Sequence, residues 1–166
     1  MKETANPRIE LLAPKKLIGK RLRMSLSKNR TGELWKAFMS ERRVITNACN
    51  SLLISMQRYD DKLDLKNFNQ DTEFEKWAAV EVSDHNYIPE KMEAYNLEGG
   101  LYAVFIHKGD ATSFNKTFQL IFHEWLPDSE YDLDNREHFE LLGDKYKNND
   151  PASEEEVWIP IKKKLE

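Results

Sequence analysis

The sequence has a single cysteine and no long apolar run. Because Cys49 is the only cysteine, an intramolecular disulfide is excluded and a reducing compartment is expected. No apolar run is long enough to span a bilayer, and residues 1–7 are too polar for a signal peptide. We therefore expect a cytoplasmic protein with no membrane partner.

The sequence also has no excess of positive charge. Its 25 lysines and arginines are outnumbered by 29 aspartates and glutamates, which gives a formal net charge of −4. A nucleic-acid-binding domain normally has a basic surface, so no direct nucleic-acid binding is expected. The local basic run from Lys15 to Arg30 is interpreted as the exposed face and edge of a strand.

Motifs of the common metal sites and nucleophilic enzymes are missing as well. His123-Glu124 lacks the second histidine of a helical zinc site, and there is no Gly-x-Ser-x-Gly motif. Cys49 is expected to be a small buried hydrophobic residue rather than a nucleophile. Gly99-Gly100 precedes a predicted strand, which indicates a turn and not a phosphate loop. No metal and no cofactor are therefore expected.

The residues that are present suffice for one domain of the α+β class. The chain has 166 residues, of which 40% are hydrophobic and 33% charged. We expect a single domain over residues 1–164, built from a first module of about 8–83 and a second module of about 91–163. The final Leu165-Glu166, after three lysines, is interpreted as a cloning remnant.

Hydrophobic periodicity predicts the same order of elements in both modules. Alternation predicts strands at 17–26, 51–59 and 73–82, and again at 101–107, 138–142 and 154–161. Helical spacing predicts a helix of about four turns from Thr31 to about 47–50, and a second one from Phe114 to Trp125. Leu126-Pro127 is expected to end the second helix, because the residue before a proline avoids the helical conformation. Loops are expected at 60–72 and 128–137.

The two modules also match at an offset of 81 residues. Gly19 and Gly100 each open a long strand, and 100 − 19 = 81. Trp77 and Trp158 each lie near the start of the last strand of their module, and 158 − 77 = 81. Similarity at a fixed offset indicates a structural repeat. Two copies favour a pseudo-twofold pair that packs together, because one copy is too small to bury both faces of its sheet.

Glu140 is a carboxylate inside a short hydrophobic strand. If Phe139 joins the core under a helix, strand alternation places Glu140 and Trp158 on the opposite face, and the repeat adds Trp77 to it. A carboxylate removed from water needs a compensating partner, and aromatic faces attract positive charge. The pattern therefore predicts a site for a cation.

Two alternatives remain open for Glu140. It could pair with an arginine, Arg21 or Arg136, in which case the tryptophans only fill space. It could instead belong to an enzyme, which would need a second polar group beside it. The sequence offers three such groups: Tyr59, Tyr102 and Glu81.

Several segments of the second module carry a family resemblance. They are Gly99-Gly-Leu-Tyr-Ala-Val-Phe-Ile-His-Lys-Gly109, Trp125-Leu-Pro127, His138-Phe-Glu140 and Val157-Trp-Ile-Pro-Ile161. Together they resemble the GyrI-like small-molecule-binding domain, also called the bacterial transcription activator effector-binding domain. The match is specific over about 91–163, and the first module supports it by element order. The resemblance implies two pseudo-symmetric β-α-β-β modules with antiparallel sheets and one helix each, which form a central ligand cleft.

The resemblance also implies a ligand site. Glu140 matches the acidic residue that meets cationic ligands among aromatic side chains in multidrug-sensing members, and Trp158 matches an aromatic position of the same cleft. The further candidate ligand-binding residues are Trp77, Tyr102 and Tyr59. The chain departs from the family in two respects. It has no helix-turn-helix segment, and Leu142 stands where many members carry a tyrosine.

Three functions follow, in descending order. The first is a stand-alone protein that binds a cationic or amphipathic aromatic small molecule in a cleft centred on Glu140. The second is a small-molecule hydrolase that uses Glu140 to position or activate water, as some stand-alone relatives hydrolyse reactive small molecules. The third is a protein-interaction role such as gyrase inhibition. The expected partner is a small-molecule ligand, and a homodimer is left open.

Overall fold

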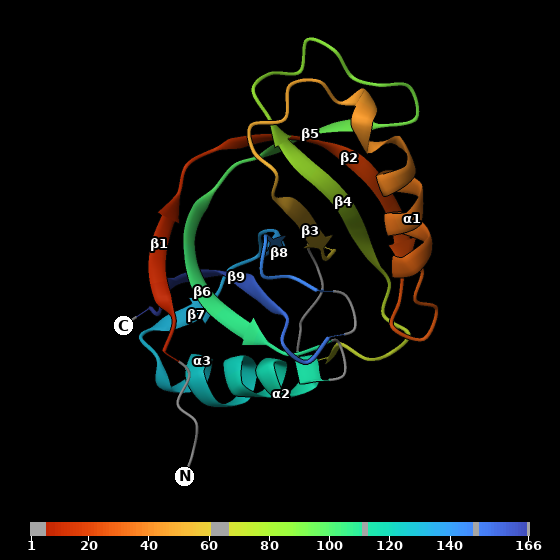
Figure 1. Ribbon diagram of the computed structural model, residues 1–166. Coiled ribbons are helices and arrows are strands. Elements are labelled where there is room, and N and C mark those ends of the chain that lie inside the picture. The colour runs from red at the N-terminus through yellow and green to blue at the C-terminus, as the bar shows by residue number, and fades with distance from the viewer. Residues whose placement is uncertain (1–5, 61–66, 111–112, 148–149, 166) are drawn as a thin grey trace.

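The computed structural model describes residues 6–60, 67–110, 113–147 and 150–165 (Figure 1). The expected loop at 60–72 thus lies partly outside the described residues. The structure has two main helical segments and nine strands in this part of the chain. The strands are β1 Arg8–Leu12, β2 Lys15–Met24, β3 Leu53–Arg58, β4 Phe74–Val82, β5 Glu93–Leu97, β6 Gly100–Lys108, β7 Tyr131–Leu133, β8 His138–Leu142 and β9 Glu154–Lys163. The α+β class is confirmed.

All strand pairs are antiparallel, and the main sheet runs in the order β1-β6-β9-β8-β3-β4-β2-β5. The short β7 pairs with β9 beside this path. The central β3–β8 pair joins the two halves into one continuous sheet. The two halves of this order match. From one end, β1 is the edge strand, β6 the long strand, β9 the last strand of a module and β8 the central strand; from the other end, β5, β2, β4 and β3 have the same roles.

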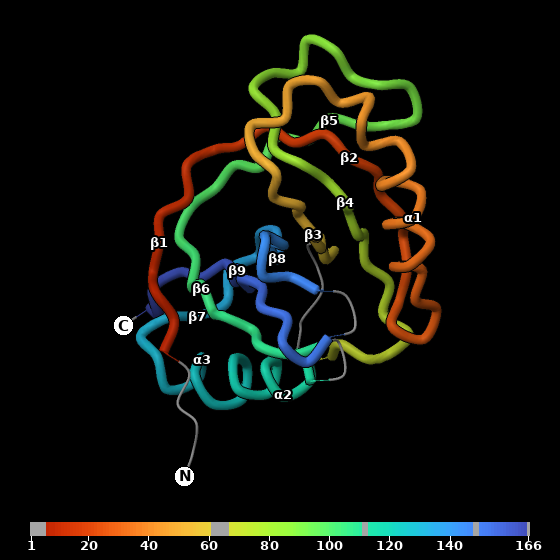
Figure 2. Tube along the Cα trace, viewed as in Figure 1, coloured from red at the N-terminus to blue at the C-terminus, as the bar shows by residue number. Residues whose placement is uncertain are grey.

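The two edge strands are exchanged between the halves. The N-terminal β1 pairs with β6 of the second half, while β5, which precedes β6 in the chain, pairs with β2 of the first half. Figure 2 shows β1 running beside β6 along its whole length. The sequence predicts a first module that begins at about residue 8, whereas Arg8–Leu12 is hydrogen-bonded to the second half.

Three hydrophobic clusters divide the core. One packs helix α1 (Thr31–Glu41) on β2 and β4, and a second packs the helix at 114–128 on β6 and β9. The third lies on the other face of the sheet and contains Trp77, Tyr102, Phe139 and Trp158. The sheet is strongly curved, with both helices on its outer side (Figure 1). We therefore call the two sides the outer face and the inner face.

Helix α1 ends earlier than the periodicity predicts. It stops at Glu41 and is followed by one 3-10 turn, Arg42–Val44. Ile45 is extended and buried, and Ala48 bridges to Val82 at the end of β4. Ile45 is therefore buried by an extended segment rather than by a further helical turn, whereas Val44 and Ala48 are exposed. Cys49 is exposed, so its predicted burial is wrong.

The second helix continues past its predicted end. It runs as α2 (Phe114–Gln119), a π-helical segment Leu120–Trp125 and α3 (Leu126–Asp128). The Leu126 N–H bonds to the Ile121 carbonyl five residues back. This wider turn lets the helix pass Pro127, which has no N–H to donate.

Glycines occur where two backbones or a guanidinium come close. A Cβ on Gly19 would lie 2.1 Å from the Ala78 carbonyl oxygen of β4. Gly100 has a φ of +122°, and a Cβ there would lie 2.7 Å from Nη1 of Arg136. Gly19 lies inside β2, which begins at Lys15 and not at Gly19 as predicted, whereas Gly100 opens β6 as predicted. Each glycine lies at a close approach that excludes a side chain.

Candidate functional site

The strand register decides which residues share a face with Glu140. Phe139 pairs with Trp158, and their rings stack 5.2 Å apart on the inner face. Glu140 pairs with Val157, which packs under the second helix on the outer face. The predicted shared face of Glu140 with Trp158 is therefore wrong. Phe139 belongs to the inner cluster rather than to a core under a helix.

The two tryptophans have hydrogen-bonding partners of their own on the inner face. The Trp77 indole N–H donates to Oε1 of Glu75 at 2.5 Å, and the Trp158 indole N–H donates to Oε1 of Glu156 at 3.1 Å. Both side chains are below 5% exposure. Tyr102 is fully buried beside them and donates to the Glu137 carbonyl at 2.8 Å. These three candidates are thus core residues on the face opposite Glu140.

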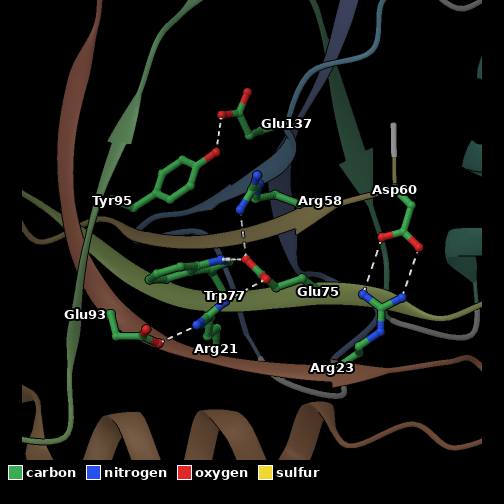
Figure 3. A network of polar contacts seen from close by, with 9 residues as sticks. All are labelled: Arg21, Arg23, Arg58, Asp60, Glu75, Trp77, Glu93, Tyr95 and Glu137. Carbon is green, nitrogen blue, oxygen red and sulfur yellow. Dashed lines mark hydrogen bonds and ion pairs between the residues drawn. The ribbon is translucent and has the colours of Figure 1, made fainter. Parts of the chain in front are cut away.

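Around Trp77, the inner face carries a chain of polar contacts (Figure 3). Glu75 accepts from Arg21 at 3.0 Å and from Arg58 at 3.2 Å. The Arg58 guanidinium lies 5.1 Å from the Tyr95 ring centroid, and the Tyr95 hydroxyl donates to Glu137 at 2.5 Å. Burial and the Glu137 carboxylate both raise the pKa of Tyr95. The carboxylate of Glu75 is thus paired with arginines of the same face.

Neither arginine proposed as a partner reaches Glu140. Arg21 is paired with Glu75 and Glu93 on the inner face. Arg136 is bonded to Asp134 and to three backbone carbonyls. The alternative in which Arg21 or Arg136 neutralises Glu140 is therefore wrong.

Glu140 instead has a carboxylate that is only partly compensated. Its Oε2 atom is buried and has no hydrogen-bond partner among the described residues. The residue as a whole keeps partial exposure, which comes from its other atoms. Burial raises the pKa of the Glu140 carboxyl, while the positive charge of Lys76 and a hydrogen bond from Gln57 oppose this rise.

Tyr59 and His138 supply aromatic surface on the same side. Tyr59 follows β3, and its ring centroid lies 5.0 Å from that of His138 and 5.7 Å from that of Phe74. Burial, with a smaller contribution from the Glu140 carboxylate, raises the pKa of Tyr59. Of the four predicted aromatic candidates, the structure therefore brings Tyr59 alone to Glu140.

His138 is a neutral aromatic residue at neutral pH. It shares the outer face with Glu140 because the two are separated by one residue along β8. Burial, with a smaller contribution from Arg136, lowers the pKa of His138 to about 3. The Phe122 ring stacks on it at 6.5 Å. His138 is not among the residues predicted for the site, although its spacing from Glu140 could have indicated this position.

Glu155 is a second acidic residue that sequence reasoning missed. It lies two residues before Val157 and therefore on the face of Glu140. Burial and the Glu140 carboxylate raise the pKa of Glu155 to about 7, and Lys76 opposes the rise. Glu81, one of the candidate catalytic partners, is on the inner face, where it accepts from Lys15 at 3.1 Å. Tyr59 is therefore the one predicted partner on the correct face.

Other kinds of site find little support in the described residues. No group of three or more histidine, cysteine, aspartate or glutamate side chains is close enough there to hold a metal ion. No helix in that part of the chain is long and apolar enough to cross a membrane. A hollow of about 610 Å³ lies at the end of α1, between Met39 and Val80, and does not include Glu140.

Known proteins share this fold. A curated relative, the transcriptional regulator BrlR of Pseudomonas aeruginosa, is 31% identical over 90 residues, which are 54% of this chain and 33% of that protein. The chain thus spans about a third of the relative it matches. A putative bacterial transcription regulation protein from Staphylococcus aureus has a TM-score of 0.69 at 14% identity, with 95% of this chain and 99% of that chain covered.

Two further solved structures bear on ligands and chemistry. SAV2435 bound to tetraphenylphosphonium has a TM-score of 0.66 at 15% identity, with 95% of this chain and 94% of that chain covered. A hydrolase encoded by lin2189 from Listeria innocua has a TM-score of 0.60 at 12% identity, with 96% and 93% covered. At these identities the two structures establish the fold.

The family model described as "GyrI-like small molecule binding domain" matches residues 5–162. This range contains both helices, β1 to β8, and all of β9 except Lys163. The chain belongs to the GyrI-like small-molecule-binding domain family.

Proposed function

We propose that this protein binds a cationic or amphipathic aromatic small molecule at Glu140. The observation that carries the proposal is the buried Oε2 of Glu140, which has no hydrogen-bond partner among the described residues. Most buried polar atoms in proteins are hydrogen-bonded, so an exception calls for a specific reason. A cationic ligand is such a reason, because it supplies the missing partner.

The energetics favour a cation over a neutral molecule. Burial of an ionised carboxylate costs on the order of several kcal/mol or more of free energy, unless a nearby positive charge compensates it. The raised pKa of Glu140 reflects the same cost, because burial disfavours the charged form of the carboxyl. A bound cation offsets this cost.

The surroundings of Glu140 suit an aromatic cation. Tyr59 and the neutral His138 present rings on the same face, and aromatic rings attract cations and pack on flat apolar ligands. The structural neighbour SAV2435 was solved with tetraphenylphosphonium, a monocation with four phenyl groups. We use this cation as the first probe.

The test is calorimetric titration with tetraphenylphosphonium. We expect saturable binding that Glu140→Gln weakens at least about tenfold, because the amide removes the charge and keeps the shape. Glu10→Gln is the control, since Glu10 is exposed on the edge strand β1 and pairs with Arg8. Equal affinities for the wild-type protein and Glu140→Gln would remove Glu140 from the site.

A second candidate function is hydrolysis. A carboxyl with a raised pKa on the same face as Tyr59 can hold and orient a water molecule, and the fold occurs in a protein described as a hydrolase. The assay would incubate the protein with a panel of electrophilic esters, lactones and epoxides and detect products by mass spectrometry. Turnover that is lost in both Glu140→Gln and Tyr59→Phe would support this function, and binding without turnover would exclude it for those substrates.

A further inference from the structure

Glu155 is the acidic side chain nearest to Glu140 in the strand register. Glu140 pairs with Val157, and Glu155 lies two residues from Val157 on the same face of β9. Diagonal neighbours on adjacent antiparallel strands lie roughly 7 Å apart. The two carboxylates thus approach each other from neighbouring strands.

The charges of this pair are not balanced as they are elsewhere in the molecule. On the inner face, Glu75 pairs with two arginines and Glu156 pairs with Arg8. On the outer face, neither Glu140 nor Glu155 has an ion pair within 4.0 Å in the described part of the chain. Among the residues that the structure describes, the two carboxylates therefore share one nearby lysine.

That lysine is Lys76, on the far side of β3 from Glu140. Lys76 pairs with Gln57, and Gln57 pairs with His138, so the three side chains form a row across β4, β3 and β8. Its charge acts on both carboxylates without reaching ion-pair distance of either. With both carboxylates ionised, the group of Glu140, Glu155 and Lys76 has a net charge of −1.

We propose that Glu155 is a second anionic contact of the Glu140 site, which selects ligands with two cationic groups on a short aromatic body over ligands with one. This inference rests on the proposed function. Glu140 binds the first cationic group, as argued above, and Glu155 binds the second. Lys76 opposes a dication more strongly than a monocation, since it repels both cationic groups.

A matched ligand pair separates the two contacts. The dication is para-xylylene-bis(trimethylammonium), and the monocation is (4-methylbenzyl)trimethylammonium, which keeps the ring and one cationic group. Neither quaternary group can lose a proton, so any change in protonation belongs to the protein. Titrations at pH 8 keep Glu155 ionised, given its pKa of about 7.

For the wild-type protein we expect the dication to bind about tenfold more tightly than the monocation. Glu155→Gln should abolish this preference and change monocation affinity by less than about twofold. Glu140→Gln should weaken both ligands. Lys76→Gln should strengthen binding of the dication more than that of the monocation, and this gain cannot arise from a damaged fold.

The outcomes distinguish the two proposals. If neither ligand nor tetraphenylphosphonium binds, the proposed function fails and this inference fails with it. If monocations bind in a Glu140-dependent way and the dication gains nothing, or its gain survives Glu155→Gln, the inference is overturned and the proposed function stands. Thermal melts of each variant confirm that the comparison concerns folded proteins.

Discussion

At the residue scale, Glu155 shows how an unbalanced charge affects stability as well as binding. Its carboxyl has a pKa of about 7 in the folded protein, against an ordinary value of 4.5. The folded state therefore holds a proton that the unfolded state has released between these two values. By linkage, this contribution to stability is complete below about pH 4.5 and is lost as the pH rises through 7.

Glu155→Gln should remove the loss of stability that the wild-type protein shows as the pH rises through 7, because a glutamine does not ionise. We expect the variant to match the wild-type melting temperature near pH 4.5 and to exceed it at pH 8. After allowance for the partial exposure of Glu155, the gain is about 1 kcal/mol, or about 2–4 °C. Calorimetric melts from pH 4.5 to 8.5 measure it, with Glu10→Gln as the control. A gain that does not depend on pH would contradict the assignment of the shift to Glu155.

Sequence reasoning identified Glu140 as an unusual charge in a strand but assigned it to the wrong face. Alternation fixes which residues of β8 share a face, and it does not say which face meets a helix. That choice depended on Phe139, which packs on Trp158 because β8 and β9 pair in this register. Glu155 was missed because it lies in a run of three glutamates. Their shared charge does not indicate which of the three lies in a site.

At the scale of elements, the long periodic segments were predictable, whereas the short strands β1, β5 and β7 were not. Both helices and the strands β2, β4, β6 and β9 have clear periodicity over nine residues or more. β7 lies in the segment 128–137, for which the sequence predicts an acidic loop. It forms because the backbone of β9 is available to pair with it, and its own side chains carry no signal of this.

Arg136 links several of these elements. Its guanidinium donates to the carbonyls of Gly99 at 2.9 Å, Leu101 at 2.6 Å and Ile161 at 3.2 Å, and it lies 4.8 Å from the Tyr102 ring centroid. The Arg136 side chain thus links the segment before β8 to β6 and β9 by hydrogen bonds.

Arg136→Met should therefore destabilise the protein by about 3 kcal/mol, because it leaves several partly buried acceptors without donors. Arg23→Met is the matched control. Arg23 pairs with Asp60 and Glu73 at an exposed position, so its loss should cost less than about 1 kcal/mol. Urea unfolding of both variants measures the difference, and similar midpoints would refute the linking role of Arg136.

At the scale of the whole molecule, matched contacts accompany the palindromic strand order. Trp77 and Trp158 each donate to a glutamate two residues earlier, and these glutamates again differ by 156 − 75 = 81. The repeat offset read from the sequence is consistent with these contacts. The exchange of the edge strands was not predictable, because neighbouring segments of a chain usually pair with each other.

The exchange of the edge strands β1 and β5 predicts which strand loses its partner when the N-terminal segment is removed. Removal of residues 1–13 deletes β1, which should leave the backbone of β6 unpaired on one side and spare the β2–β5 pair. We expect amide hydrogens of β6 to exchange faster, and those of β2 to keep their protection, by hydrogen-exchange mass spectrometry. Leu11→Ala serves as the control, since Leu11 is 80% exposed. Faster exchange in β2 with an unchanged β6 would contradict the observed pairing.

The exchanged β1 also sets an order of events during synthesis on the ribosome. Leu12 pairs with Gly100, so 100 − 12 = 88 residues must be added after Leu12 before this ladder can begin. At about 5–20 residues per second, β1 remains without its partner strand for roughly 5–20 s. During that time the nascent chain exposes an unpaired strand in which Arg8 and Glu10 flank Ile9. Charged residues on β1 disfavour its pairing with the strands of other nascent chains.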